Sequence, residues 1–387
     1  MANFPERGEI YRRLGVRPII NAAGTVTRFG GSRTRPAAVA AMVEAADTLV
    51  DMAELNAKAG EIVAQITGAE AGFVCNGSAS GLILQAAAVI AGNDPAKMQC
   101  LPETDGMKNE IVIQTAHRFP YDQSYRAAGA KLVTVGTARR THEWELDAAI
   151  NERTAAVAYL FSPFLARTAL SLTKVAEISH ARGVPVIVDG ASMVPPRDNL
   201  TKYIRMGADM VVISGGKGIQ GPQGSGLLFG RKDLIEAAVA SASPNQFLGR
   251  GMKVSKEEII GFVTALKLFV QEDEEAQMNQ FRKKAQHIVD ALIEIPGLHL
   301  TVEHDEHDFL TPNTVIQFDE SWHGASKADI LNALEKGEPP IHLQGTLLPD
   351  DMVAVDPFNV DEDEMSVLIN RLREELLSQN MTTPSSA

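Results

Sequence analysis

The sequence predicts an α/β protein built around a mostly parallel sheet that is covered by helices on both faces. Two observations predict this fold class. Short apolar runs alternate with helical segments through the middle of the chain. Turn-forming and polar residues bound these runs, as is typical of buried parallel strands. At 387 residues the chain is also long enough for a second, smaller lobe.

The N-terminal part of the chain predicts an arm followed by two helices. Residues 1–35 contain a short amphipathic piece and a stretch rich in Gly, Thr and Arg. Pro36 begins a helical pattern over residues 36–46, because proline suits the first turn of a helix. A second helical pattern covers residues 52–69. We expect residues 1–45 to form an N-terminal arm and linking helix.

Residues 46–248 are expected to form the large domain, with a seven-stranded sheet. The apolar runs that predict its strands are residues 71–77, 109–115, 130–136, 154–162, 184–190, 208–214 and 225–230. The helical patterns between them are residues 79–92, 121–129, 146–153, 172–183 and 200–207.

Residues 249–387 are expected to form a smaller α+β domain. Residues 255–295 read as one long helical stretch, and its acid-rich run QEDEEAQ predicts a solvated helix face. After it we expect a strand at residues 311–319 and a helix at residues 326–337. An extended stretch at residues 339–345 and a final helix at residues 361–377 follow. The tail, residues 379–387, is expected to fray.

Composition excludes several classes of function. The formal net charge is −13 and the pI is about 5.2, which argues against a nucleic-acid partner and against an anionic membrane surface. No apolar stretch approaches the roughly 20 residues needed to span a bilayer. Two cysteines give no disulfide framework, and the first residues are too charged for a signal peptide. We therefore expect a cytoplasmic protein.

Polar residues gather where the predicted strands end. Ligands of open α/β sheets bind at the carboxyl ends of the strands. The residues there are Asn76 to Ser80, His117, Ser162, Asp189 to Ser192, and Ser214 to Lys217. This set contains a carboxylate, a histidine, an amine and a Gly/Ser turn that opens a helix and so forms an anion site.

One cofactor satisfies all these groups. Lys217, in a partly dry pocket, becomes a nucleophilic amine that forms a Schiff base with an aldehyde. Asp189 keeps a pyridine nitrogen protonated, while the Gly/Ser turn and Ser214 hold a phosphate. The sequence thus predicts pyridoxal 5′-phosphate (PLP). A magnesium ion at Asp189 is the alternative, but no second acidic residue lies near another strand end.

The order of these motifs resembles that of fold-type I PLP enzymes, with Ser214 and Lys217 matching their Ser-x-x-Lys motif. Within them the chain is similar to the bacterial seryl-tRNA selenium transferases and their small-molecule relatives, the D-glucosaminate-6-phosphate ammonia-lyase group being the nearer. The segments that carry this match are INAAGTVTRFGGSRTRP, GPQGSGLLFGRKDLI and PPIHL. The resemblance implies an aspartate aminotransferase-like large domain and covers residues 15 to 375.

The resemblance also implies roles for individual residues. His117 would stack on one face of the pyridine ring, and Ala191 would pack on the other. Gly77, Ser78 and Ala79 would hold the phosphate together with Ser214. Ser162 is a candidate partner of the ring hydroxyl, and Ser192 completes the cofactor-binding set.

One departure from the family concerns the substrate carboxylate. Many relatives carry an arginine shortly after the PPI stretch, where this chain has His342. Either His342 binds the carboxylate weakly, or an arginine of the arm, Arg28, Arg33 or Arg35, takes the anion. Those arginines could equally bind a substrate phosphate or lie at a dimer interface. We therefore take Arg28, Arg33 and His342 as the candidate substrate-binding residues.

The predicted activity is a PLP-dependent lyase. It would eliminate the β-hydroxyl of a small hydroxylated amino acid or amino-sugar acid and release ammonia and a 2-keto acid, with Lys217, Asp189 and His117 as catalytic residues. The alternatives are an amino-acid racemase or epimerase, a β-replacement transferase of the selenium transferase type, and an idle PLP-binding regulator. A tRNA substrate is disfavoured by the charge and by the missing N-terminal region of the transferases.

Two further expectations concern partners. The resemblance implies a homodimer or larger homo-oligomer with active sites at the interface, where residues 221–224 (GPQG) would approach the neighbour's phosphate site.

His304 and His307 lie among acids and could bind a metal, but no ligands at structural spacing accompany them. An exposed polar loop is the preferred interpretation, and no metal is expected.

Overall fold

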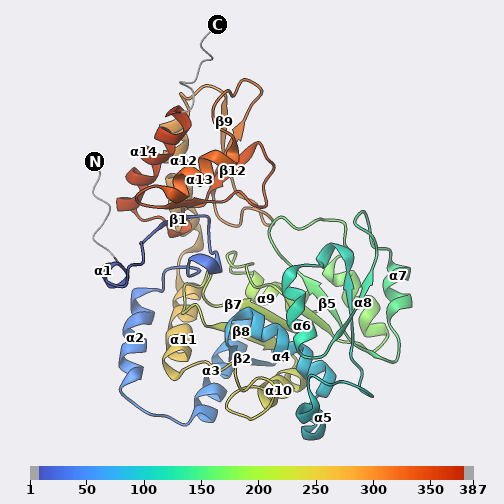
Figure 1. Ribbon diagram of the computed structural model, residues 1–387. Coiled ribbons are helices and arrows are strands. Elements are labelled where there is room, and N and C mark those ends of the chain that lie inside the picture. Colours follow the sequence, from blue (N-terminus) through green and yellow to red (C-terminus); the bar gives the residue numbers. More distant parts are fainter. Residues whose placement is uncertain (1–7, 379–387) are drawn as a thin grey trace. The chain divides into compact units, whose positions relative to one another are not determined.

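The computed structural model describes residues 8–378, which form two compact units. The large unit is Ser32–Glu272, and the small unit combines the chain up to Gly31 with the chain from Asp273 onward. The expected tail, residues 379–387, lies outside the described residues. Figure 1 follows the chain from blue to red through these units.

The large unit is built on a mixed, mostly parallel sheet of seven strands, as predicted. In spatial order the strands are β2 (Ala71–Cys75), β8 (Gly226–Gly230), β7 (Met210–Ser214), β6 (Val186–Asp189), β5 (Thr154–Leu160), β3 (Glu110–Gln114) and β4 (Lys131–Val135). Only β8 runs antiparallel to its neighbours, β2 and β7, so β2 and β7 point the same way. The fold class predicted from the alternating pattern is confirmed.

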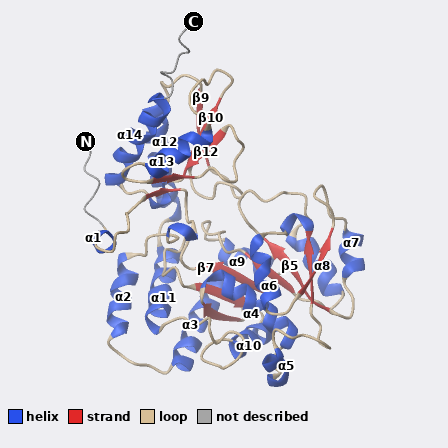
Figure 2. Cartoon of the chain, viewed as in Figure 1, coloured by secondary structure: helices blue, strands red, loops and turns tan. Residues whose placement is uncertain are grey.

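Helices surround this sheet (Figure 2). They are α2 (Pro36–Ala46), α3 (Met52–Thr67), α4 (Gly77–Ala91), α5 (Pro95–Cys100), α6 (Gln123–Ala127), α7 (Glu143–Ala149), α8 (Leu172–Ala181), α9 (Asn199–Arg205), α10 (Lys232–Ser241) and α11 (Lys256–Gln271), with 3-10 turns η2 (Thr115–His117) and η3 (Pro120–Asp122). In β7, Met210 and Val212 share a core cluster with α4 and α10, while the alternate residues Val211 and Ile213 are equally buried. Both faces of the sheet are therefore covered.

Two predicted helices are shorter than expected. The segment 121–129 divides into the turn η3 and the short helix α6. Helix α7 ends at Ala149 rather than near residue 153, because Asn151 forms a turn that leads into β5. The Asn151 carbonyl accepts from Thr154 N at 3.0 Å, and its side chain accepts from Arg153 N at 2.8 Å.

The boundary between the units differs from the expected one at residue 248. The expected single helix over 255–295 is two helices, α11 in the large unit and α12 (Glu274–Leu292) in the small unit. Helix α11 packs along α2, which places residues 249–272 with the large unit. Asp273 caps α12 by accepting from Ala276 N at 3.0 Å. The arm also divides, because residues up to Gly31 pack with the small unit.

The small unit is an α+β assembly, as predicted. Its strands are β1 (Ile20–Ala22), β9 (Leu298–Glu303), β10 (Asn313–Phe318), β11 (Ile341–Leu343) and β12 (Met352–Val355). Its helices are α1 (Glu9–Arg12), α12, α13 (Lys327–Lys336) and α14 (Glu362–Ser378), with 3-10 turns η1 (Thr27–Phe29) and η4 (Pro357–Asn359). Strand β10 lies between β12 and β9, and β1 pairs in parallel with β11. One apolar cluster joins the strands with α12, α13 and α14.

Strand β9 was not expected, although its sequence LHLTVE alternates apolar and polar residues. The polar loop expected around His304 and His307 follows it. The loop begins at His304, whose Nδ1 lies 3.4 Å from Arg282 Nη2. Over residues 8–378 we find no group of His, Cys, Asp or Glu side chains placed to hold a metal ion.

None of the helices between residues 8 and 378 combines the length and apolar character that crossing a membrane requires.

The acid-rich run QEDEEAQ, residues 271–277, spans the end of α11 and the first turn of α12. Acidic residues at the start of α12 suit the positive end of its helix dipole.

Candidate active site

The carboxyl ends of five strands bring the predicted residues to one edge of the large unit's sheet. The register places Cys75 beside Gly226 and Gly226 beside Ser214, so β2 and β7 end level with each other. It also aligns Leu160 with Asp189 at the ends of β5 and β6. Gly77 follows the end of β2, His117 follows β3, Ser162 follows β5, and Lys217 follows β7.

Lys217 lies in a tight loop whose positions 216 and 218 have room only for glycine. A Cβ on Gly218 would stand 1.9 Å from Val194 O, and one on Gly216 would stand 2.5 Å from Gln223 Cα. The loop closes through Gln220 N, which donates to Lys217 O at 2.9 Å. Burial lowers the pKa of the Lys217 amine, and the charge of Asp189 offsets this in part. A lowered pKa increases the neutral, nucleophilic fraction of this amine.

Asp189 ends β6 as a buried carboxylate, 7 % exposed. Burial raises its pKa, while a hydrogen bond from Ala191 N at 3.0 Å and the charge of Lys217 lower it. Burial outweighs these two stabilising contacts. A carboxylate in this condition suits a cationic ring nitrogen, and this donor set fits the pyridine of PLP.

His117 is a buried, neutral ring at the end of η2. Burial lowers the pKa of His117 to about 4. Its ring meets that of Tyr159 edge to face, with centroids 4.3 Å apart, and its Nδ1 lies 3.5 Å from Leu160 N. A small cavity is lined by both His117 and Asp189, together with Tyr125, Tyr159 and other residues. His117 and Asp189 thus share one cavity.

This shift predicts an acid sensitivity of the cofactor-free protein. The unfolded histidine takes up a proton below its ordinary pKa of 6.5, whereas folded His117 does so only near 4, so stability is lost as the pH falls between these values. The loss is at most about 3 kcal/mol. We expect His117→Phe to flatten the fall of the thermal unfolding temperature between pH 7 and pH 4.5. An unchanged pH profile in this variant would contradict the assignment.

The first turn of α4 is a candidate anion site. Gly77 begins this 15-residue helix with φ of 65°, which favours glycine. Asn76 makes no capping bond and instead donates from its side chain to Lys253 O at 2.8 Å. The first-turn N–H groups, with Ser78 and Ala79 in this turn, therefore face outward without a side-chain cap. Their number and the helix dipole suit the phosphate of PLP.

The remaining predicted cofactor residues lie around Asp189 and Lys217. Ala191 is linked to both strands, because its N–H donates to Asp189 and its carbonyl accepts from Ser214 N at 3.1 Å. Ser214 is buried, and Ser192 follows Ala191 in the turn after β6. The Ser162 hydroxyl donates to Pro163 O at 3.3 Å.

The three predicted substrate residues divide between the units. Arg28 and His342 belong to the small unit, where both contact Phe29. The guanidinium of Arg28 lies 5.6 Å from the centre of the Phe29 ring, and the His342 ring lies 4.1 Å from it. His342 Nδ1 also lies 3.3 Å from Glu335 Oε1. Arg33 is exposed at the start of the large unit.

The sequence-based reasoning missed several residues at this edge. Tyr125 and Tyr159 line the cavity with His117, and both are buried. Ser32 contacts the Lys217 loop directly. Tyr125 lies within a predicted helix and Tyr159 within a predicted strand, where an aromatic residue reads as ordinary core. Arg35, weighed above as an anion binder, is instead engaged with Glu272 and Ile219 O.

Comparisons with known proteins identify the family to which this chain belongs. The family model described as L-seryl-tRNA selenium transferase matches residues 19–282. D-glucosaminate-6-phosphate ammonia lyase of Salmonella typhimurium is 32 % identical over 94 % of this chain and 97 % of its own. A solved structure of D-glucosaminate-6-phosphate ammonia-lyase superposes with a TM-score of 0.84 at 32 % identity, covering 96 % of this chain and 99 % of that one.

Two other proteins extend the comparison. The 5′-C-glycyluridine monooxygenase-decarboxylase of a Streptomyces species is also 32 % identical, over 95 % of this chain and 92 % of its own. The cysteine desulfurase CsdA of Escherichia coli matches with a TM-score of 0.57 at 19 % identity over 97 % of this chain and 99 % of its own, which shows a shared fold alone. The resemblance inferred from the motifs is confirmed.

Proposed function

Because this chain belongs to the L-seryl-tRNA selenium transferase family, whose relatives are fold-type I, PLP-dependent enzymes, we propose that it is a PLP-dependent ammonia-lyase for a small hydroxylated amino acid or amino-sugar acid. The observation that carries this proposal is the match to the ammonia lyase over almost the whole of both chains. The lowered pKa of Lys217 beside Asp189 supports it independently.

The cofactor would be held by residues from five strand ends. Lys217 would bind its aldehyde, Asp189 would pair with its ring nitrogen, and His117 and Ala191 would pack against its ring. Its phosphate and ring hydroxyl would be bound by Gly77, Ser78, Ala79, Ser192, Ser214 and Ser162. When bound, this group supplies an electron sink for the carbanion formed at the substrate's α-carbon.

Lys217 would have two roles. Its amine would hold the aldehyde of the cofactor, and once released by the substrate it would accept the α-proton. Burial favours the second role, because it lowers the pKa of the amine. Loss of the β-hydroxyl gives an enamine, which hydrolyses to a 2-keto acid and ammonia. The water lost in elimination is regained in hydrolysis, so substrate and products balance.

Arg28, Arg33 and His342 are the proposed groups for the substrate's anions. His342 stands where the resemblance places an arginine in many relatives, and its Nδ1 lies 3.3 Å from Glu335 Oε1. A carboxylate bound by His342 and a phosphate bound by an arginine would suit a phosphorylated amino-sugar acid.

The assembly and compartment complete the proposal. We propose a cytoplasmic homodimer or larger homo-oligomer in which residues 221–224 approach the neighbour's phosphate site. Cys75 and Cys100 are free in the structure, which agrees with a reducing compartment.

The test is to follow products with a panel of substrates. We expect ammonia and a 2-keto acid in equal amounts from D-glucosaminate 6-phosphate or a related hydroxylated amino acid, with D- and L-serine and threonine in the panel. Inversion of the α-carbon without ammonia would indicate a racemase, and incorporation of an added nucleophile a β-replacement transferase.

The oxygenase-decarboxylase relative makes a second activity worth measuring, since it has the same identity to this chain as the lyase. Consumption of O₂ with release of CO₂, and no 2-keto acid, would assign this chain to that reaction and overturn the lyase.

A further inference from the structure

The chain segment at residues 32–35 lies against the backbone of the Lys217 loop. The Ser32 hydroxyl lies 2.7 Å from Lys217 O and 3.0 Å from Gly216 O, and it donates to one of them at a time. Ser32 N donates to Gly216 O at 3.0 Å. These contacts join residues that are 184 and 185 positions apart in the sequence.

Arg35 holds the far side of the same loop. Its N–H donates to Gln220 O at 3.0 Å, and its Nε donates to Ile219 O at 2.9 Å. Gln220 has φ of 60°, a left-handed conformation that a non-glycine residue keeps only when its surroundings impose it. Arg35 therefore donates to the peptide carbonyl before Gln220 and to the one after it.

Glu272 fixes Arg35 in turn. Arg35 is 8 % exposed, and its Nη1 forms an ion pair with Glu272 Oε1. The carbonyl of Glu272 also accepts a hydrogen bond from Arg197 Nη2. Ser32 and Glu272 are the first and last residues of the large unit. The chain therefore enters this unit at a residue that hydrogen-bonds to the Lys217 loop, and it leaves the unit at a residue that forms an ion pair with Arg35.

We propose that Ser32 and Arg35 are positioning residues that hold the Lys217 loop, so that the placement of the reactive amine depends on the two points where the chain passes between its compact units. This proposal rests on the proposed function, because it assigns to the loop the task of presenting Lys217 to an aldehyde.

The composition of the loop explains why it needs such support. Gly215, Gly216 and Gly218 flank Lys217, and glycine loses more conformational freedom on ordering than any other residue. Val194 and Gln223 lie so close to Gly218 and Gly216 that no side chain fits there. The carbonyls of residues 216, 217, 219 and 220 all accept hydrogen bonds from Ser32 or Arg35. Ser32 and Arg35 thus add to the hydrogen bond from Gln220 N to Lys217 O that closes the loop.

The test measures how fast Lys217 of the cofactor-free protein forms its covalent adduct with PLP, trapped with borohydride and located by peptide mapping. We expect Ser32→Ala and Arg35→Lys to slow this reaction by about 10-fold or more, since small misplacements of a reacting group are costly. Ser32→Thr, which keeps the hydroxyl, should restore the rate. In steady state kcat should fall while KM for the substrate changes little.

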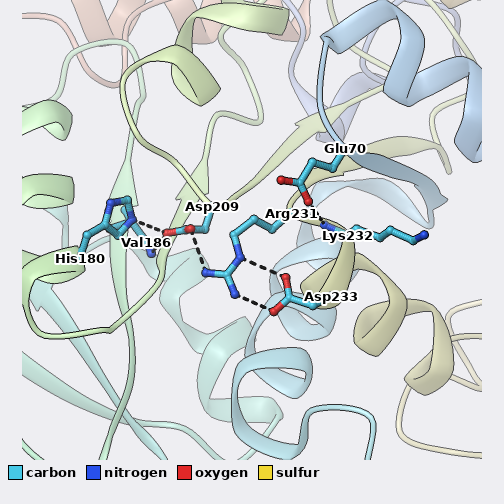
Figure 3. Close-up of polar contacts among 7 residues, drawn as sticks. All are labelled: Glu70, His180, Val186, Asp209, Arg231, Lys232 and Asp233. Carbon is cyan, nitrogen blue, oxygen red and sulfur yellow. Dashed lines mark hydrogen bonds and ion pairs between the residues drawn. The ribbon is translucent and has the colours of Figure 1, made fainter.

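Arg231 provides a matched control within the large unit (Figure 3). Its guanidinium contacts Asp209 at 3.1 Å and Asp233 at 2.6 and 3.0 Å, and Asp209 also pairs with His180 and accepts from Val186 N. Asp209 precedes β7, at the strand end opposite Ser214. Arg231→Lys should lower the unfolding temperature and leave the adduct rate unchanged.

The outcomes separate the two proposals. If Ser32→Ala and Arg35→Lys lower the unfolding temperature but form the adduct at the wild-type rate, the positioning role is overturned and the lyase is untouched. If the wild-type protein forms no adduct at Lys217, the positioning role and the proposed function fail together. If the adduct forms but no substrate is converted, only the reaction assignment fails.

Discussion

Lys217→Ala is expected to abolish the lyase activity and the visible absorbance of lysine-bound cofactor. The substitution removes both the amine that binds the aldehyde and the base that takes the α-proton. Acid–base catalysis alone contributes about 10²–10⁴-fold, so the combined loss should reach at least about 10⁴-fold. The fold should persist, because burial already disfavours the charged form of this amine.

Absorbance spectra and ammonia release of Lys217→Ala, compared with the wild-type protein, check this result. Lys232→Ala is the matched control, since that lysine is exposed at the start of α10 and its ammonium lies 3.9 Å from Glu236. Retention of the wild-type spectrum by Lys217→Ala would show that another lysine binds the cofactor, and the site described above would be wrong.

Asp189→Asn is expected to have opposite effects on activity and on the stability of the cofactor-free protein. Without the carboxylate, the ring nitrogen loses the negative charge that keeps it protonated, and activity should fall by about 10²-fold or more. In the cofactor-free protein, burial raises the pKa of Asp189, so its charged form is penalised in the folded state. Asn carries no such charge and should unfold at a higher temperature.

The size of this stability effect depends on pH. Below the ordinary aspartate pKa both states of the wild-type protein hold a proton on Asp189, and the variant should have no electrostatic advantage. As the pH rises through the raised pKa of folded Asp189, the wild-type protein loses stability and the advantage of Asn grows. Thermal unfolding from pH 4 to pH 8 measures this difference, and a cofactor-free variant less stable than wild type at pH 8 would contradict it.

The fold itself does not choose the reaction. The lyase and the oxygenase-decarboxylase share the same identity with this chain, and both align along nearly all of it. One fold can support different reactions, and proteins that share it often differ in the groups placed around the substrate. The groups around the substrate must therefore select the outcome, which makes Arg28, Arg33 and His342 the first residues to vary once a substrate is known.

Much of the candidate site could be predicted because each of its parts lies within a short stretch of sequence. An apolar run that ends in Asp189, and another that ends in Ser214 with Lys217 beyond it, place both groups at strand ends without any knowledge of contacts. The Gly/Ser turn before α4 is equally local. Parallel pairing then brings these ends to one edge, as the register of β5, β6 and β7 shows.

Other features could not be predicted from local patterns. The helical periodicity of residues 255–295 continues across the break at Asp273, so only the packing of α11 on α2 reveals where the large unit ends. Arg35 reads as a free cation in the arm, whereas in the structure it is buried against Glu272.

The sequence by itself determined the fold class, the cofactor and the central pair of Lys217 and Asp189, because periodicity and strand-end chemistry are properties of neighbouring residues. Only the tertiary structure decided the boundary of the large unit, the pairing of Arg35 with Glu272 and the support of the Lys217 loop by Ser32. Those features join residues about 180 or more positions apart. Such contacts form because a buried polar group needs a hydrogen-bond partner. A local sequence pattern does not identify a partner that lies far away in the sequence.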